Sequence, residues 1–188
     1  MASDRTILVM GDSLSAAYGI RPEQGWVALL TQRLQTSGYG YEVVNASVSG
    51  ETSNGGLQRL PRAIQIHRPS IVILELGAND GLRGLPVPVT KDNLAKMVQL
   101  VQKAGARVVL VGIRIPPNYG PRYATEFAGM YPEIAKQFQL PLIPFLLDKV
   151  ALDPALMQDD GLHPNARGEP QVLETVWQGL EPLLKKNR

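Results

Sequence analysis

The segment Ile71-Val-Ile-Leu-Glu-Leu76 decides the fold, because it is short, rich in β-branched residues and almost entirely apolar. Such a run is typical of a strand in a parallel sheet whose two faces are both covered. Thr6 to Met10 (TILVM) and Arg107 to Ile113 (RVVLVGI) have the same character. Two shorter runs, Glu42 to Val44 and Leu142 to Leu146, complete a prediction of five strands.

Helical patterns separate these strands. In each of them apolar residues recur at spacings of three and four, as on the buried face of an amphipathic helix. Pro61 and Pro132 weaken two of the predictions. The predicted helices cover residues 26–34, 57–67, 94–101, 127–138 and 172–184. The alternation indicates an α/β fold, with a five-stranded parallel sheet covered by helices on both faces, and the length suits a single domain over residues 1–188.

Composition narrows the function. The 188 residues include 19 Lys and Arg against 17 Asp and Glu, and the resulting net charge of +2 is too small to favour a nucleic acid partner. There is no cysteine and the two histidines lie far apart, so we expect no metal site and no cofactor. No apolar run approaches the ~18 residues that span a bilayer, so we expect no stable membrane insertion. The basic run Lys185-Lys186 with Arg188 is interpreted as a solvated helix end.

The loops after the strands are the expected place for a functional site, because ligands of parallel α/β sheets bind outside the carboxyl ends of the strands. After the first strand comes Gly11-Asp12-Ser13-Leu14-Ser15. A serine hydroxyl becomes a nucleophile when a base removes its proton, and that base is normally histidine. His67 precedes Arg68-Pro69 and is interpreted as a surface or capping residue. His163 follows a polar turn and is the candidate base.

An acid three residues before this histidine could fold back onto the imidazole. Asp160 has that spacing, whereas Asp159 is one residue too far. Such a contact fixes the tautomer and stabilises the imidazolium formed during catalysis. The alternative from the residues alone is an ordinary acidic turn with Asp160 as a helix cap.

Acyl transfer also needs hydrogen-bond donors for the developing oxyanion. Asn79 follows the clearest strand and offers a side-chain amide, and Gly50 follows the second strand and could bring its backbone N–H close to a ligand. The backbone N–H of Ser13 could be a third donor. Turn chemistry alone would also account for Asn-Asp-Gly and Ser-Gly in loops.

Together, these segments resemble the GDSL, or SGNH, hydrolases. The resemblance rests on Gly11-Asp-Ser-Leu14, Gly50, Gly77-Ala-Asn-Asp80 and Asp160-Gly-Leu-His-Pro164, which occur in the family's order over nearly the whole chain. It implies a flavodoxin-like three-layer α/β/α sandwich. It also implies that Ser13 is the nucleophile, His163 the base and Asp160 its orienting acid. Ser13, Gly50 and Asn79 would form the oxyanion hole.

The stretches 11–20, 25–30, 44–50 and 116–120 look like the bacterial TesA-type branch of this family. That branch contains arylesterases, acyl-CoA thioesterases and lysophospholipases, so the expected substrates are small or lipid acyl esters and thioesters. The branch is typically exported to the periplasm, which favours a removed signal over a cytoplasmic location, since Met1 to Arg5 leads straight into a strand. We expect a monomer. An apolar, proline-stiffened loop should form one wall of an acyl groove, with Arg114, Ile115, Pro116 and Tyr119 as its candidate residues.

Two alternatives remain at this point. A carbohydrate acetyl esterase of the same family would use the same residues on a different substrate. A flavodoxin-like module could instead use Gly11 to Ser15 to hold the phosphate of FMN. The second alternative leaves Asp160 and His163 unexplained. A Walker loop, a Gly-x-Gly-x-x-Gly fingerprint and a Gly-x-Ser-x-Gly elbow are all absent from the sequence.

Overall fold

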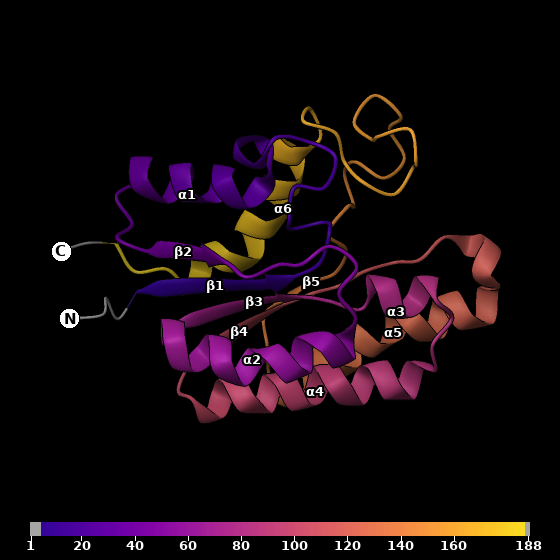
Figure 1. Cartoon of the computed structure of the whole chain (residues 1–188), viewed down its shortest axis with the longest axis horizontal. Helices are drawn as coiled ribbons and strands as arrows, with labels where there is room; N and C mark the ends of the chain where they lie inside the picture. The colour runs from indigo at the N-terminus through magenta and orange to yellow at the C-terminus, as the bar shows by residue number, and fades with distance from the viewer. Residues whose placement is uncertain (1–4, 187–188) are drawn as a thin grey trace.

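The computed structural model describes residues 5–186 and shows a five-stranded parallel sheet between two layers of helices (Figure 1). The predicted three-layer α/β/α fold is therefore confirmed. Met1 to Asp4, on which the interpretation of the N-terminus depends, lie outside the described residues, as does Arg188 of the basic run.

The strands follow the order β2-β1-β3-β4-β5, and every neighbouring pair is parallel. The three central strands are buried over nearly their whole length, which explains their unbroken apolar sequences. The last strand is shorter than predicted. After Ile143 the chain leaves the ladder, and the Gly112 carbonyl accepts the N–H of Leu146 instead of the next N–H in register. The strands are β1 (Thr6–Gly11), β2 (Glu42–Asn45), β3 (Ile71–Glu75), β4 (Arg107–Val111) and β5 (Leu142–Ile143).

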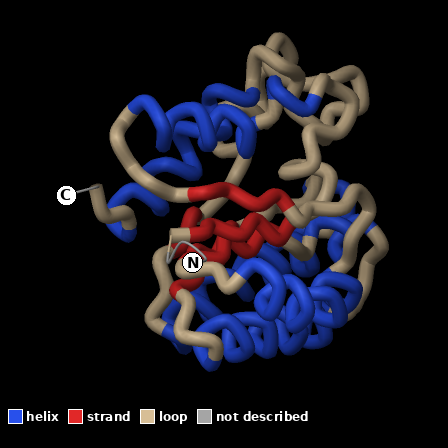
Figure 2. The backbone as a smooth tube through the Cα atoms, turned by 60° about the vertical axis from the view of Figure 1, so that its left-hand side comes forward, coloured by secondary structure: helices blue, strands red, loops and turns tan. Residues whose placement is uncertain are grey.

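Helices cover both faces of this sheet (Figure 2). One layer contains α1 (Trp26–Thr36) and α6 (Glu169–Leu180), which pack on each other. The other contains α2 (Ser53–His67), α4 (Val87–Lys103) and α5 (Pro121–Phe138), with α4 between its two neighbours. Short elements complete the chain: α3 (Ala78–Leu82) and the 3-10 turns η1 (Pro22–Gln24), η2 (Pro117–Tyr119) and η3 (Glu181–Leu183).

Two prolines lie inside helices that the sequence predicted with difficulty. Pro61 is within α2 and Pro132 within α5, and both helices continue through them. Both prolines are exposed, so the carbonyl that lacks an N–H partner one turn earlier can be hydrated. A proline on the solvent side of a helix therefore does not always end the helix, although proline generally disfavours the helix interior.

The order of the strands determines where a ligand can bind. In a doubly wound sheet with this order, the connections from β1 and from β3 leave toward opposite faces, which opens a crevice at their carboxyl ends. Gly11 at the end of β1 pairs with Glu75 at the end of β3. The segments carrying Ser13 and Asn79 therefore leave the sheet side by side at this crevice.

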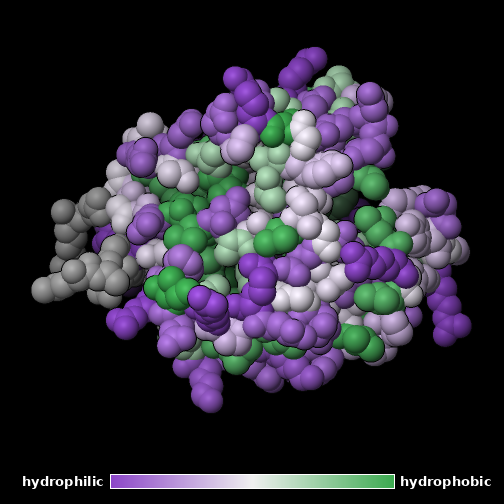
Figure 3. All heavy atoms as spheres, in the orientation of Figure 1, coloured by the Kyte–Doolittle hydropathy of each residue, from purple (hydrophilic) through white to green (hydrophobic). Residues whose placement is uncertain are grey.

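The core lies on both faces of the sheet, with Trp26, Phe127 and Tyr131 among its largest buried side chains. On the face shown in Figure 3, hydrophobic residues form small patches separated by hydrophilic ones. Leu152 is an exception to burial, because 97% of its surface is exposed. Within residues 5–186, no helix has both the length and the apolar character that crossing a membrane would require.

Candidate active site

The candidate nucleophile lies on a tight turn directly after β1. The backbone N–H groups of Ser15 and Ala16 both donate to the carbonyl of Asp12, at 3.1 and 3.0 Å. The Asp12 carboxylate accepts the N–H of Leu14 at 3.0 Å, which closes the turn a second time. These bonds fix the backbone on either side of Ser13, whose half-buried side chain lines a cavity.

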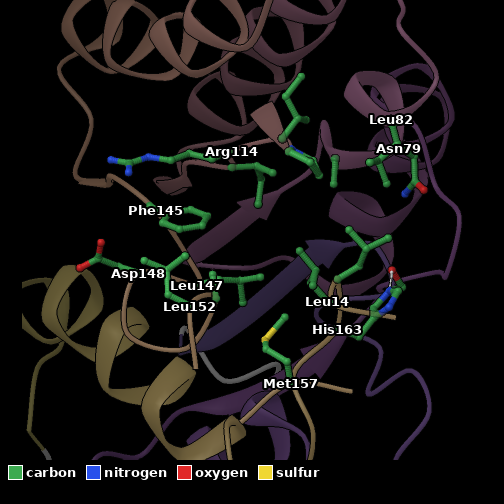
Figure 4. Close-up of a pocket in the computed structure, with 18 of the residues that line it drawn as sticks. Leu14, Asn79, Leu82, Arg114, Phe145, Leu147, Asp148, Leu152, Met157 and His163 are labelled. Atoms are coloured by element: carbon green, nitrogen blue, oxygen red, sulfur yellow. Dashed lines mark hydrogen bonds between the residues drawn. The ribbon is translucent and has the colours of Figure 1, made fainter. Parts of the chain in front are cut away.

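His163 reaches this serine from the other end of the chain. Its Nε2 lies 2.8 Å from Ser13 Oγ, and its Nδ1 lies 2.5 Å from Asp160 Oδ2. An ionised carboxylate can only accept, so Nδ1 carries the hydrogen and Nε2 is free to accept the proton of Ser13. Figure 4 shows this contact at one end of the cavity. The structure therefore brings together the three residues of the predicted triad.

Asp160 organises its own turn as well as the imidazole. Its Oδ1 accepts the backbone N–H groups of Leu162 and His163 at 2.9 and 3.0 Å. Burial raises the pKa of Asp160, but the hydrogen bonds from the His163 ring and from the two N–H groups outweigh it and leave the pKa below its ordinary value. The carboxylate therefore stays ionised opposite the imidazole at neutral pH. The residue closes a turn and orients the base at once, but its interpretation as a helix cap is wrong, because the next helix, α6, begins only at Glu169 with Gly168 as its N-cap.

Two further residues, neither of which a local sequence pattern predicts, support the turn that carries His163. The ring of Tyr18 lies against the His163 ring, tilted by 39° with centroids 4.5 Å apart. Gln158 donates from Nε2 to the carbonyls of Tyr18 and Pro164, at 2.8 Å each, and so ties the two turns together. Tyr18 stands five residues after Ser13, but no spacing rule connects it to a base 145 positions later. His67, by contrast, ends α2 before β3 begins, at the opposite edge of the sheet.

The candidate oxyanion donors lie in different surroundings. Asn79 lines the cavity from α3, and its amide donates to the carbonyl of Glu51 at 2.9 Å and to Asp12 Oδ2 at 3.3 Å. Gly50 is exposed, adopts a φ of 81° and is not among the residues that line the cavity. Arg59 on α2 stabilises this region by bonding the Glu51 carboxylate at 2.6 Å.

A cavity of about 450 Å³ extends from Ser13 and His163 along the carboxyl ends of the strands. Figure 4 shows His163 and Asn79 at one end and Phe145 and Asp148 at the other. Of the predicted wall residues, Arg114, Ile115 and Pro116 line it, and the Arg114 guanidinium lies over the Phe145 ring, 4.9 Å from its centroid. Most of the lining is apolar: Leu14, Ala78, Leu82, Ile113, Ile115, Pro116, Pro117, Phe145, Leu147, Ala151, Leu152, Met157 and Leu162.

The fourth predicted wall residue lies elsewhere. Tyr119 is not among the residues that line the cavity. Its hydroxyl donates to the carbonyl of Leu82 at 2.9 Å, so η2 is fastened to the end of α3 and the ring is used as a brace. In the part of the chain that the structure describes, no group of three or more His, Cys, Asp or Glu side chains could hold a metal ion.

Comparison with known proteins agrees with this geometry. Residues 9–169 match the model of the GDSL-like lipase/acylhydrolase family. The chain belongs to that family. It is 50% identical to Esterase TesA of Pseudomonas aeruginosa over 183 residues, 97% of this chain and 91% of the relative. It is 47% identical to an arylesterase of Vibrio mimicus over 93% of this chain and 87% of the relative.

A further relative and two solved structures of the family are also similar to this chain. A thioesterase 1/protease 1/lysophospholipase L1 of Escherichia coli is 44% identical over 97% of this chain and 86% of its own length. A crystal structure of TesA superposes with a TM-score of 0.93 at 50% identity, covering 96% of this chain and all of the other. An SGNH-hydrolase family esterase superposes with a TM-score of 0.80 at 37% identity, covering 98% and 99%. The chain is thus an acylhydrolase of this family that acts on small-molecule esters.

Proposed function

We propose that the protein hydrolyses carboxylic esters and acyl thioesters through a covalent acyl-enzyme on Ser13. The observation that carries the proposal is the unbroken hydrogen-bonded series from Ser13 Oγ through the His163 ring to Asp160, at 2.8 and 2.5 Å. A hydroxyl, a base and an orienting carboxylate in this order form the arrangement that activates serine in acyl transfer. The apolar cavity beside the hydroxyl has the chemistry of an acyl-chain site.

In the first half-reaction, Ser13 Oγ attacks the acyl carbon while His163 Nε2 accepts its proton. The imidazolium that forms is stabilised by the Asp160 carboxylate on one side and covered by the Tyr18 ring on a face. When the tetrahedral intermediate collapses, the bond to the leaving alcohol or thiol breaks, and His163 returns the proton to that group. The acyl chain remains bonded to Ser13.

In the second half-reaction, water attacks the acyl-enzyme. His163 removes a proton from the water, and the carboxylic acid leaves as the proton returns to Ser13. The proposed donors for the oxyanion in both steps are those predicted from the sequence: the backbone N–H groups of Ser13 and Gly50 and the Asn79 amide. Both hydrogens of the Asn79 amide are engaged in this structure, by the Glu51 carbonyl at 2.9 Å and by Asp12 Oδ2 at 3.3 Å, so donation to the oxyanion requires a shift of the amide within this network.

The deciding experiment compares the protein with its Ser13→Ala variant on p-nitrophenyl butyrate. We expect the variant to lose at least about 1000-fold in kcat/KM with an unchanged circular dichroism spectrum, because removal of a triad residue eliminates nucleophilic catalysis. A variant that kept most of the activity would contradict the proposal.

The same assay distinguishes the substrate classes. Decanoyl esters and decanoyl-CoA should be hydrolysed with higher kcat/KM than acetate esters, because a longer chain removes more apolar surface from water in the cavity. Preference for acetylated sugars would favour a carbohydrate esterase instead. Size-exclusion chromatography with light scattering would test the monomer that we propose, in which one chain supplies the triad and the cavity.

A further inference from the structure

Two carboxyl side chains lie buried directly beneath the nucleophile turn. Asp12 follows β1, Glu75 ends β3, and both are 0% exposed. Within residues 5–186, neither forms a salt bridge with a lysine or arginine. An ionised carboxylate without a cation is costly to bury, and two adjacent ones repel each other as well. At least one of the two carboxyl groups must therefore carry a proton.

The hydrogen bonds around Glu75 leave one oxygen unused. Its Oε2 accepts the Ser15 hydroxyl at 2.6 Å and the Asp12 backbone N–H at 3.3 Å. Its Oε1 is buried and has no partner that could donate to it. Such an orphan oxygen is expensive in a folded protein unless it carries a hydrogen of its own and donates that hydrogen. A proton on the Glu75 carboxyl removes the deficit because the Asp12 carboxylate can accept it: the two side chains share a hydrogen bond.

Asp12 shows the opposite pattern, because both of its oxygens already accept. Oδ1 accepts the Leu14 N–H at 3.0 Å, and Oδ2 accepts the Asn79 amide at 3.3 Å. Donors directed at both oxygens favour the ionised form of a carboxyl group. The hydrogen-bond pattern therefore assigns the charge to Asp12 and the proton to Glu75.

The direction of the pKa changes agrees with this assignment. Burial raises the pKa of Glu75 well above its ordinary value, and the neighbouring charge of Asp12 raises it further. Burial also raises the pKa of Asp12, but the Leu14 N–H, His163 and Glu75 oppose the rise, while Asp80 adds to it, and the result is about 6. Both carboxyl groups therefore hold a proton more tightly than usual, as a buried pair without a cation should.

The first glycine of the Gly11-Asp-Ser-Leu motif makes room for the pair. A Cβ atom at Gly11 would lie 2.7 Å from Glu75 Oε2 and 2.8 Å from the Ser15 hydroxyl. Both contacts are closer than packed atoms allow, so any larger residue would displace the carboxyl group. Glycine is therefore required at position 11 to leave space for the Glu75 carboxyl group, and not for Ser13.

We propose that Glu75 is a neutral carboxylic acid that donates a hydrogen bond to the ionised Asp12, and that the pair positions the Asn79 amide and the Ser13 turn. Glu75 and Asp12 are positioning residues, because they act through Asn79, Leu14 and Ser15. The catalytic consequence rests on the proposed function of Asn79 and Ser13, whereas the protonation of Glu75 does not.

The first test is infrared spectroscopy of the whole protein at pH 8. The difference spectrum between the wild type and Glu75→Gln should contain the carbonyl-stretch band of a protonated carboxyl group, present in the wild type alone. Isotope exchange into deuterium oxide should shift that band. Absence of the band would overturn the proposal, whatever the enzyme assays show.

The second test compares Glu75→Gln with Asp12→Asn. Glutamine is neutral and can still donate, so kcat and KM should stay within about threefold of the wild type. Asparagine turns one acceptor of residue 12 into a donor, which opposes either Leu14 or Asn79. We expect kcat to fall by at least about 10-fold with KM changed by less than about threefold, below the 100- to 1000-fold loss of an entire oxyanion donor.

The comparison has clear contrary outcomes. If Glu75→Gln were as damaging as Asp12→Asn, the charge would lie on Glu75, and the assignment would be wrong. If neither variant changed kcat, the pair would not position the catalytic groups. Failure of the proposed function would be seen separately, as activity that survives in Ser13→Ala.

Discussion

The turn that carries Ser13 and the turn that carries His163 meet in one site but are built differently. The Ser13 turn is anchored to the sheet by buried groups: the Asp12 carboxylate, the Glu75 carboxyl and the indole N–H of Trp26, which donates to the Leu14 carbonyl at 3.1 Å. The His163 turn lies at the surface and is held by its own Asp160. The nucleophile is thus held by buried groups of the core, whereas the base is held near the surface by its own Asp160 and by the contacts of Tyr18 and Gln158.

This difference has consequences for mutations. Changes in the Ser13 turn should disturb stability and catalysis together, because its supports are part of the core. Changes in the His163 turn should affect catalysis with little effect on stability, because its supports face solvent.

The largest effect is expected for Asp160→Asn. The amide keeps the side chain's size, but its N–H₂ group would oppose the hydrogen on His163 Nδ1 and favour the wrong tautomer. In a serine triad this replacement costs on the order of 10⁴ in kcat. The Asp160 side chain is 37% exposed, so the melting temperature should change by no more than a few degrees. A kinetic and calorimetric comparison with the wild type measures both, and a large loss of stability would contradict the contrast.

The next effect compares a glycine from each turn. In Gly11→Ala the new methyl group would meet Glu75 and Ser15 at 2.7–2.9 Å, and such overpacking costs about 1–3 kcal/mol. We expect kcat to fall about 10-fold or more, because Ser15 and Glu75 must move. Gly161→Ala has open space around the new methyl group but a φ of 67°, which costs about 1–2 kcal/mol through strain.

Urea denaturation and kcat of the two alanine variants sharpen the comparison. Gly11→Ala should lose more stability and more activity than Gly161→Ala. The reverse order would mean that the surface turn, and not the buried one, depends on close packing.

The smallest effect on catalysis is expected at a residue that bridges the two regions. Glu169 follows the His163 turn, is 2% exposed, and accepts the N–H of Trp26 at 2.8 Å. Burial raises its pKa to about 7, although the Trp26 N–H opposes the rise. The folded state therefore holds this proton more tightly than the unfolded state. The resulting stability is complete below about pH 4.5 and is lost as the pH rises through 7.

Glu169→Gln removes this titration and keeps an acceptor for Trp26. We expect the variant to be more stable than the wild type at pH 8, by on the order of 2 kcal/mol, and equal or less stable at pH 4.5. Urea unfolding at both pH values measures the difference. An unchanged pH dependence in the variant would show that Glu169 does not titrate in this range.

The sequence predicted the fold well because each strand is a short apolar run and each helix has a regular apolar stripe. It also identified Ser13, Asp160 and His163, since a nucleophile and a DxxH pair are local patterns that belong at the carboxyl edge of a sheet. It missed Glu75, which resembles a lone polar residue in a buried strand. Its partners Asp12 and Ser15 are 63 and 60 positions away in the chain, and no local periodicity relates them.

The roles of Tyr18 and Gln158 were not predicted for the same reason. Their contacts join residues from opposite ends of the chain and form only in the folded protein. Tyr119 was predicted as a wall residue because it is an aromatic residue in an apolar loop. The hydrogen bond from its hydroxyl to the Leu82 carbonyl depends on the tertiary structure and could not be predicted from the sequence. β5 was predicted too long because apolar residues continue past Pro144, where the pairing stops.

The closeness of Asp160 to His163 in the chain affects how the site is assembled during folding. Base and acid are three residues apart and can find each other within one turn, whereas Ser13 and His163 are separated by 150 positions. Assembly of the triad therefore requires one long-range closure, the docking of the C-terminal segment on the sheet, and loop-closure entropy opposes that step. Recovery of esterase activity during refolding should consequently report the arrival of this segment, and it should lag behind the formation of β1 and β3.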